Sequence, residues 1–562
     1  MLADRLSHYR RDALRDDLVA AFIVAILLIP QSLAYALVAG LPPQVGVFAS
    51  ILPMLAYAAL GSSSVNSVGP VAVVALMTAQ ALSPVLQEGT PASAAALVLA
   101  CETGLLLAAA ALLKLDALAA LLSTPVLHGF STGAALTIAL TQLPSLLGGQ
   151  AAGSTAPEVL TAWWHAPQAA HLATSALGVG ALALLVLARR WAQPLVARWM
   201  APGAARLVAR CAPLAVIALA MALAWSTAAD RHGVALVGEL PAFGLTLSWP
   251  PLDAALWWRL LPSAVPLALV AFVSSLAVAE GLALRRREQV IARRELAGLA
   301  GANLAASVCG GMPVGGSFSR SAINAEAGAR TRAAGAWTAL MMALTMLLLS
   351  TPLAWLPKAV LAASIVIAVL GVVEWRAFAD AWRYARGEWA VMAAVAVLTM
   401  MAGSQWALGV GVALSIGLLL QRSANPHVAR IGRVGDTEHY RNVDRHAVQC
   451  TPGVLGLRID ESLLFTNARR LAGVVDQHLH NQPDTTRVVL LMSPVNAIDF
   501  SGLEALHALH DVLAARGIRL DLSEVKGPVL DRLRAGGWSE WFSGRLFLSH
   551  HQGMQDQAGQ AA

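Results

Sequence analysis

Long apolar stretches separated by short polar loops dominate residues 1–425. Four of them approach or reach the roughly 20 residues that cross a bilayer as a helix. These stretches lie at residues 18–38, 92–113, 262–283 and 334–350. Their abundance of Ala and Leu favours helices over the strands of a barrel. The pattern therefore predicts a polytopic α-helical membrane protein.

The pattern changes after residue 425, where charged residues become frequent and apolar runs shrink to the length of a strand. Buried strands are expected at 453–459 and 487–493, with amphipathic helices at 465–480 and 501–517. This alternation predicts a small soluble α/β domain. We therefore expect a transmembrane domain at residues 1–425 and a soluble domain with a C-terminal tail at residues 426–562.

Composition agrees with a chain that lies mostly in lipid. Hydrophobic residues make up 57% and charged residues 13%, against about 25% charged residues in soluble domains. The net charge of +6 is concentrated in loops, which indicates orientation in a membrane rather than nucleic-acid binding. The four cysteines are scattered without the spacing of metal ligands. We expect no metal, no cofactor and no cleaved signal peptide.

Basic residues in short loops predict the orientation of the helices, because Lys and Arg collect on the cytoplasmic side. Five clusters stand out, at Arg10–Arg15, Arg189–Arg210, Arg285–Arg294, the pair Arg330 and Arg332, and Arg376–Arg386. Each cluster is separated from the next by an even number of membrane crossings if about seven spans precede residue 230 and about seven follow it. Both termini are then expected in the cytoplasm.

Two polar, glycine-containing segments interrupt the apolar pattern in corresponding positions of the two halves. They are GSSSVNSVGPVAVVAL at residues 61–76 and CGGMPVGGSFSRSAIN at residues 309–324. Each precedes a short apolar helix. Irregular backbone is tolerated at membrane depth only where protein or a water-filled cavity satisfies its hydrogen bonds. Paired interruptions of this kind indicate the binding site of a transporter built from inverted repeats.

The starts of the two short helices are suited to an anion. The first N–H groups of a helix have no partner within the helix and carry a partial positive charge. Pro70 is expected in the first turn, where its missing N–H costs nothing. Gly69 and either Gly315 or Gly316 would let the backbone approach a ligand closely.

Arg320 lies in this second segment, between Ser319 and Ser321. An arginine inside the membrane region is expensive unless a partner or an anion compensates its charge. We therefore predict that Arg320 binds an anion together with neighbouring hydroxyls. The alternative is a structural arginine that pairs with a carboxylate or caps another helix.

Gln31 and Tyr35 lie four residues apart in the first apolar stretch and so share one helix face. Their amide and phenol groups could donate hydrogen bonds to an anion. A hydrogen bond between helices explains such a pair equally well.

These motifs resemble those of the sulfate permease (SulP) family. The resemblance rests on GLPPQVGVFASILPMLAYAALGSSSVNSVGPVAVVAL at 40–76, STPVLHGFSTGAALTIALTQLPSLLG at 123–148 and the long segment at 293–335. It implies a 7+7 inverted repeat of about 14 spans, with a core domain that moves against a gate domain. It also implies an anion held between the starts of the third and tenth spans. The site residues implied in this chain are Gln31, Tyr35, Val68, Gly69, Pro70, Val71, Phe318, Ser319 and Arg320.

The chain departs from the family at one position that bears on coupling. Many members that are coupled to protons or sodium carry an acidic residue just before Ser-Leu in the eighth span, where AFVSSLAVAEGLA has Ser274. A sodium site is therefore not expected, because a cation in lipid needs compensating oxygens and charge. Proton coupling through Ser274 is equally in doubt. The protein is then expected to exchange anions or to run uncoupled, unless Glu102, deep in another apolar stretch, provides the coupling. A hydrogen bond between helices would explain Glu102 equally well.

Residues 488–537 resemble the STAS domain that follows the membrane part in this family. In related stand-alone STAS proteins the serine equivalent to Ser501 is phosphorylated, which makes Ser501 a regulatory candidate. We prefer a capping role for Ser501, with Glu504 three residues on completing a capping box.

The resemblance favours a secondary transporter of an inorganic anion, with sulfate as the first choice and no enzymatic activity. Bicarbonate, chloride or C4-dicarboxylate transport and an anion channel remain alternatives, because backbone donors discriminate poorly among these ions. A nucleobase permease would share the fold but would need carboxylates where this chain has Ser274 and the Ser-Arg-Ser cluster. A membrane-tethered signalling protein is the remaining alternative outside transport. We expect a homodimer, with possible STAS contacts, in a bacterial inner membrane.

Overall fold

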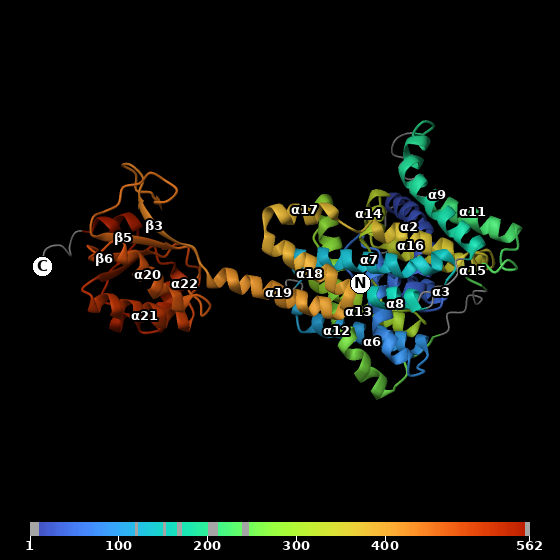
Figure 1. The fold of residues 1–562 in the computed structure, drawn as a ribbon, viewed down its shortest axis with the longest axis horizontal. Helices are drawn as coiled ribbons and strands as arrows, with labels where there is room; N and C mark the ends of the chain where they lie inside the picture. The colour runs from blue at the N-terminus through green and yellow to red at the C-terminus, as the bar shows by residue number, and fades with distance from the viewer. Residues whose placement is uncertain are drawn as a thin grey trace. The chain divides into compact units, whose positions relative to one another are not determined.

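The computed structural model describes residues 11–117, 122–149, 153–165, 171–200, 212–238 and 247–556. Arg10 and residues 201–210, which belong to two of the basic clusters, lie outside the described residues. The chain divides into two compact units, of which the first ends at Ser415 and the second begins at Ile416 (Figure 1).

The first unit consists of helices and one very short sheet. The helices of its first half are α2 (Arg11–Val38), α3 (Pro43–Phe48), α4 (Leu52–Leu60), α5 (Ala72–Leu86), α6 (Ala92–Leu112), α7 (Thr124–Leu147), α8 (Ala156–His165), α9 (Leu172–Val196) and α11 (Ala212–Ser226). Those of its second half are α12 (Ala254–Arg286), α13 (Ala292–Val308), α14 (Phe318–Glu326), α15 (Ala333–Ala354), α16 (Lys358–Leu370), α17 (Trp375–Tyr384), α18 (Arg386–Ala402) and α19 (Ser404–Ala424), and the boundary between the two units falls within α19.

The composition of these helices suits a bilayer. Among the described residues, nine helical stretches are long and apolar enough to cross a membrane, and α5 and α11 are shorter apolar helices. Large apolar side chains such as Leu344, Leu347 and Leu348 of α15 are exposed on the surface of the unit, where lipid would cover them. The predicted number of about 14 spans stays a prediction.

The helices pack into two groups. In the core group, α6 lies against α12 and α13, α4 against α13, and α2 against α14 and α15. In the gate group, α7 lies against α16 and α18, and α9 against α11 and α16. Gly129 and Gly133 let α7 approach α18 closely, because a Cβ at either position would lie within 2.5 Å of a carbonyl oxygen of α18. The two groups meet where α2 lies against α16 and α5 against α7.

The two halves of the first unit are joined at its centre by the short sheet. Strand β1 (Val68–Gly69) and strand β2 (Gly315–Gly316) pair antiparallel, with Val68 opposite Gly316 and Gly69 opposite Gly315. The strands come from the two segments that interrupt the apolar pattern, and both are buried. Each segment therefore satisfies part of its backbone on the other, inside the membrane part where irregular backbone needs partners.

The second unit is an α/β domain with a six-stranded sheet in the order β4-β3-β5-β6-β7-β8. Strand β3 is antiparallel to both neighbours, and β5 to β8 are parallel. The strands are β3 (Val428–Arg433), β4 (Tyr440–Asn442), β5 (Val454–Ile459), β6 (Arg487–Leu491), β7 (Arg519–Ser523) and β8 (Leu546–Phe547). The helices are η2 (Ala468–Arg470), α20 (Leu471–His480), α21 (Phe500–Ala515), α22 (Gly527–Ala535), α23 (Trp538–Trp541) and α24 (His550–Gln555).

Both faces of the sheet are covered, as the alternation along β6 illustrates. Val488 and Leu490 belong to the apolar core formed with α20, α21 and α22, whereas Val489 and Leu491 pack with β3, β4 and α24. Because both faces are buried, β6 is apolar after its first residue, Arg487. The predicted strands and helices of this region are confirmed as β5, β6, α20 and α21, although α20 begins only at Leu471.

The expected capping role of Ser501 is wrong. Helix α21 begins at Phe500, and the side chain of Asp499 caps it by accepting a hydrogen bond from the N–H of Gly502. A carboxylate at this position stabilises the helix start as a serine would. Ser501 therefore lies inside the first turn, and its regulatory role stays a prediction.

We predict that His550 makes the C-terminal unit sensitive to acid. Burial lowers the pKa of this imidazole to about 4, whereas an unfolded histidine has a pKa of about 6.5. Between these values the unfolded chain binds a proton that the folded chain does not, so the free energy of unfolding must fall as the pH falls from about 6.5 to about 4, by at most about 3 kcal/mol.

The measurement is the melting temperature of the C-terminal unit in the full-length protein, followed from pH 7.5 to pH 4. His550→Gln should show a shallower pH dependence than the unaltered protein, whereas the matched change at exposed His439 should leave it as it is. Equal slopes in all three proteins would contradict the prediction.

Candidate anion site

The paired strands bring the starts of two helices together at the centre of the core group. Helix α5 begins at Ala72 after β1, and α14 begins at Phe318 after β2. Their N-cap residues Val71 and Ser317 are extended, and in the described structure neither helix has a side-chain hydrogen bond at its cap. The first N–H groups of both helices therefore remain available to a ligand.

The structure corrects the expected position of Pro70. This residue precedes the N-cap of α5 rather than lying in its first turn. Its contribution is the carbonyl group, whose oxygen accepts a hydrogen bond of 2.9 Å from Nη1 of Arg320. Pro70 therefore helps to hold the arginine.

Arg320, the third residue of α14, is 1% exposed. Its Nη1 also lies 3.4 Å from Oε1 of Gln31, while Nε and Nη2 have no hydrogen-bond partner among the described residues. Within that part of the chain, no carboxylate forms an ion pair with Arg320. A buried guanidinium with two unpartnered nitrogens is unfavourable unless an anion joins it. The contact to Pro70 lies before a helix, so Arg320 does not cap the end of one.

The other predicted residues differ in how close they lie to Arg320 and in how far they are exposed. A Cβ added at Gly69 would lie 3.4 Å from Nη2 of Arg320, so this glycine lets the guanidinium pass close to the backbone. Val68 and Tyr35 are buried, and Val71 is half-buried. Phe318 is 64% exposed, and Ser319 is exposed beside it, so these two lie on the open side of the turn that carries Arg320.

Neither coupling candidate forms a hydrogen bond or ion pair with Arg320 in the part of the chain that the structure describes. The hydroxyl of Ser274 donates to the carbonyl of Val270 at 2.6 Å, within its own helix. Glu102 is buried in α6, and its Oε2 has no hydrogen-bond partner among the described residues. Their roles in coupling stay predictions.

Polar side chains that the sequence analysis did not identify fix the backbone of β2. The hydroxyl of Ser275 accepts a hydrogen bond of 2.6 Å from the N–H of Gly316. Nδ2 of Asn303 donates to the carbonyl of Val314 at 3.1 Å, and Oδ1 of Asn303 accepts from the N–H of Val314 at 2.9 Å. Both side chains are fully buried, so β2 is held by α12 and α13 as well as by β1.

Glu295 has the corresponding role for the segment that leads to β1. Its carboxylate is fully buried and accepts hydrogen bonds from the hydroxyl of Tyr57 at 2.6 Å, from the hydroxyl and N–H of Ser62 at 2.6 and 2.9 Å, and from the N–H of Ser63 at 3.0 Å. All of these groups donate, so the carboxylate is bound as an acceptor only. Charge-assisted bonds of this kind are the strong ones.

The network continues from Glu295 to the helix that carries Arg320. Nδ2 of Asn66 lies 3.5 Å from Glu295 and donates to Tyr57 at 3.2 Å, while its Oδ1 accepts from the hydroxyl of Ser321 at 3.1 Å. Ser321 in turn accepts from the N–H of Ser67 at 2.8 Å. The signal for these residues was in the sequence, because Glu295 and Asn303 are polar positions inside a helix of the membrane part.

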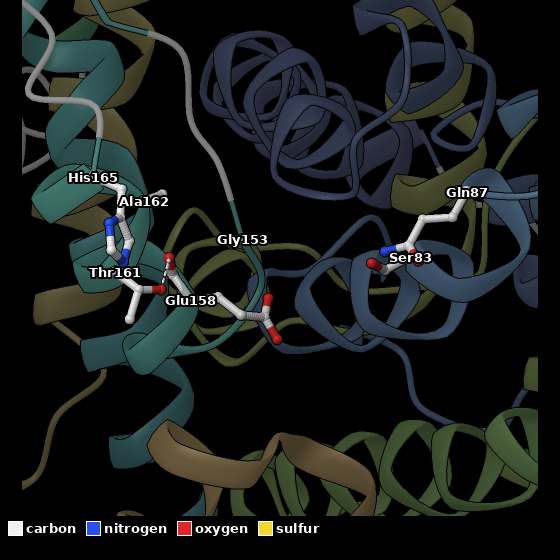
Figure 2. A pocket seen from close by; sticks show the side chains of 7 residues that line it. All are labelled: Ser83, Gln87, Gly153, Glu158, Thr161, Ala162 and His165. Atoms are coloured by element: carbon white, nitrogen blue, oxygen red, sulfur yellow. Dashed lines mark hydrogen bonds between the residues drawn. The ribbon is translucent and has the colours of Figure 1, made fainter.

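A cavity of about 450 Å³ lies at the opposite end of α5 and is separate from the predicted site (Figure 2). Its lining residues come from the end of α5 and from α8 with the loop before it: Ser83, Gln87, Gly153, Glu158, Thr161, Ala162 and His165. Glu158 accepts hydrogen bonds from the N–H and the hydroxyl of Ser154. The cavity contains none of the predicted anion-site residues, and its carboxylate does not suit an anion.

We predict that Glu295→Gln destabilises the core group. The amide would turn a donor toward groups that already donate, which leaves buried N–H or O–H groups without acceptors at a cost of about 2–4 kcal/mol. The melting temperature of the purified protein in detergent measures the effect. Glu280→Gln is the matched control, because Glu280 is exposed on α12. An unchanged melting temperature for Glu295→Gln would contradict the described network.

Comparisons with known proteins agree with this architecture. Residues 14–395 match the model of the sulfate permease family, and residues 445–553 match the STAS domain. A "Probable sulfate transporter MT1781" of Mycobacterium tuberculosis (strain CDC 1551 / Oshkosh) is 34% identical over 94% of this chain and 92% of its own. The "Probable sulfate transporter 4.2" of Arabidopsis thaliana is 31% identical over 96% of this chain and 80% of its own.

Solved structures show the same fold. The murine anion transporter Slc26a9 in its inward-facing state has a TM-score of 0.88 at 22% identity, over 99% of this chain and 93% of that one. The transmembrane domain of the cyanobacterial bicarbonate transporter BicA has a TM-score of 0.61 at 20% identity, over 71% of this chain and 98% of that one. The predicted fold class is confirmed. The chain belongs to the sulfate permease family and carries a C-terminal STAS domain.

Proposed function

We propose that this protein transports an inorganic anion, sulfate in the first place, and binds it between the starts of α5 and α14. The observation that carries the proposal is the buried Arg320, whose Nε and Nη2 have no partner within the described ranges, beside two helix starts that no described side chain caps. Two relatives, one from a bacterium and one from a plant, bear the name of probable sulfate transporter, which supports sulfate as the substrate.

The geometry suits an oxyanion. The free Nε and Nη2 of Arg320 can donate to its oxygens, and the first N–H groups of both helices add further donors with positive partial charge. Gln31 lies against the same guanidinium, and Ser319 and Phe318 occupy the exposed side from which an ion would enter. Tyr35, Val68, Gly69 and Val71 complete the proposed site.

Alternating access would follow from movement of the core group, which holds the whole site, against the gate group. Coupling to a cation is not required in this proposal, because Ser274 stands where a carboxylate would be needed and its hydroxyl is bound within α12. We propose anion exchange or uncoupled transport, with Glu102 as the candidate for proton coupling. Bicarbonate, chloride and C4-dicarboxylate remain alternative substrates, and an anion channel the alternative mode.

We further propose a bacterial inner membrane as the location, with both termini in the cytoplasm. The basic residues of the loops support this orientation. A homodimer, a regulatory role for Ser501 in the STAS domain and the absence of enzymatic activity complete the proposal. The sequence has no G-x-x-x-x-G-K-[ST] loop for a nucleotide. Its G-x-S-x-G match at residues 129–133 lies inside helix α7 rather than at the strand-to-helix turn that a hydrolase nucleophile requires.

We expect Arg320→Gln to abolish most sulfate transport. Losing two charge-assisted hydrogen bonds should reduce kcat/KM roughly 100-fold, which is about 2.7 kcal/mol. The measurement is uptake of radiolabelled sulfate into proteoliposomes, with bicarbonate, chloride and a C4-dicarboxylate as competitors. Saturation with concentration would distinguish a transporter from a channel.

The matched control is Arg469→Gln, which removes an exposed arginine of the STAS domain. Both variants must retain the melting temperature of folded protein for the comparison to count. Unchanged flux of every anion in Arg320→Gln would refute the proposed site, and stimulation by a sodium gradient would refute the proposed mode of coupling.

A further inference from the structure

Two glutamine side chains connect the core group to the gate group. Gln80 lies on α5, which packs against α12 of the core group, and Gln405 is the second residue of α19. Helix α19 packs with the gate group, since a Cβ added at Gly411 would lie 2.9 Å from a side chain of α7 and from one of α18. In the same helix, the hydroxyl of Ser415 lies 2.8 Å from that of Ser123, which precedes α7. The two glutamines therefore lie on opposite sides of the boundary between the groups.

Each glutamine forms hydrogen bonds across that boundary. Oε1 of Gln80 accepts from the N–H of Ser404, the first residue of α19, at 2.8 Å, and its Nε2 donates at 3.2 Å to the carbonyl of Ser154, in the loop before α8. Nε2 of Gln405 donates at 2.6 Å to the hydroxyl of Ser263 on α12. Ser404 and Ser263 are buried, which shields their bonds from competition with water. We call these three hydrogen bonds the glutamine contacts.

The glutamine contacts lie near one face of the membrane part. Helix α19 has 21 residues, enough to cross a bilayer, so its first residues lie at the face opposite to the one at which Ala424 ends it. From Ala424 the chain continues into the STAS domain. On α5, Gln80 follows Ala72, where the helix begins at the candidate anion site, by about two turns or about 12 Å. One helix therefore links the anion site to the boundary with the gate group.

Next to these contacts the two groups are separated by the cavity of about 450 Å³ between the end of α5 and α8 (Figure 2). Ser83 and Gln87 line it from α5, and Glu158 and His165 line it from α8. A boundary that includes a cavity buries less apolar surface than a packed one, so polar contacts account for a larger share of its closure. Hydrogen bonds break and re-form at a modest net cost, as a contact that opens in every transport cycle requires.

We propose that the glutamine contacts close the candidate anion site at the face opposite to the STAS connection, and that Gln80 and Gln405 release their partners whenever the site opens there. The proposal rests on the proposed movement of the core group against the gate group. Helices α5 and α12 would move with the anion site, whereas Ser154 and Ser404 would stay with α7 and α18, against which α8 and α19 pack. Gln80 and Gln405 are positioning residues, because in the described structure they bind groups across the boundary rather than Arg320.

The first test joins the two groups covalently. Gln80→Cys/Ser404→Cys, in full-length protein whose four cysteines are replaced by alanine, is cross-linked with a short bis-methanethiosulfonate. Cross-linking should reduce uptake of radiolabelled sulfate into proteoliposomes roughly tenfold, because the groups can no longer part, and a reducing agent should restore the uptake. The matched control Ser123→Cys/Ser415→Cys joins two helices within the gate group and should keep its uptake when cross-linked.

A distance measurement tests the proposal without any transported anion. Spin labels carried by p-acetylphenylalanine in place of the exposed Trp164 of α8 and the exposed Leu252 before α12 leave the native cysteines as they are. Gln80→Ala/Gln405→Ala should raise the population with a longer distance between the labels roughly tenfold, because loss of the glutamine contacts favours the open state. The control Gln193→Ala, at an exposed position of α9, should leave the distances unchanged. Equal distance distributions in the double variant and the unaltered sequence would overturn the proposal.

The two experiments separate this proposal from the proposed function. Failure of the cysteine-free protein to transport any anion would refute the proposed function, and the label distances would then decide whether the glutamine contacts hold the groups together. Uptake that survives cross-linking of Gln80→Cys/Ser404→Cys would overturn this proposal and leave sulfate transport in place.

Discussion

A buried positive charge, which has no acidic partner in the part of the chain that the structure describes, is the constraint on which the centre of this structure depends. Arg320 is removed from water, and among the described residues its guanidinium donates only to the carbonyl of Pro70 and, at a longer distance, to Gln31. Such a group is tolerated only if the surroundings are rigid enough to hold it and open enough to admit a negative ion. The antiparallel strands β1 and β2 provide the rigidity, and the exposed Phe318 and Ser319 mark the open side.

One helix supplies much of that rigidity to both halves of the site. Glu295, near the beginning of α13, binds the segment before β1, and Asn303, two turns later, binds the segment before β2. Helix α13 also packs against α4 and α6. The support is thus built from α13 and the helices around it, although the strands that it supports come from different repeats. Displacing α13 would disturb both helix starts at once.

The architecture could be predicted from sequence because its signals are local. Apolar stretches, basic loops and the two glycine-containing interruptions identified the membrane helices and the junction at Arg320. The supporting contacts could not be predicted, since Tyr57 and Glu295 meet across 238 positions of the chain. Two local expectations also failed: Pro70 precedes the N-cap of α5 instead of lying in its first turn, and Asp499 rather than Ser501 caps α21. Competing cap residues a few positions apart cannot be separated by spacing alone.

The brevity of β1 and β2 has a consequence for how this family can vary. Each strand has two residues and is followed almost at once by a helix. Inserting one residue between strand and helix would rotate the helix by about 100° and would carry Arg320 or the first amides of α5 away from the shared centre. Substitutions on the outward faces can accumulate freely, but changes of length in these two junctions cannot. The dimensions of the junctions, more than the identity of most side chains around them, should therefore be what divergent relatives preserve.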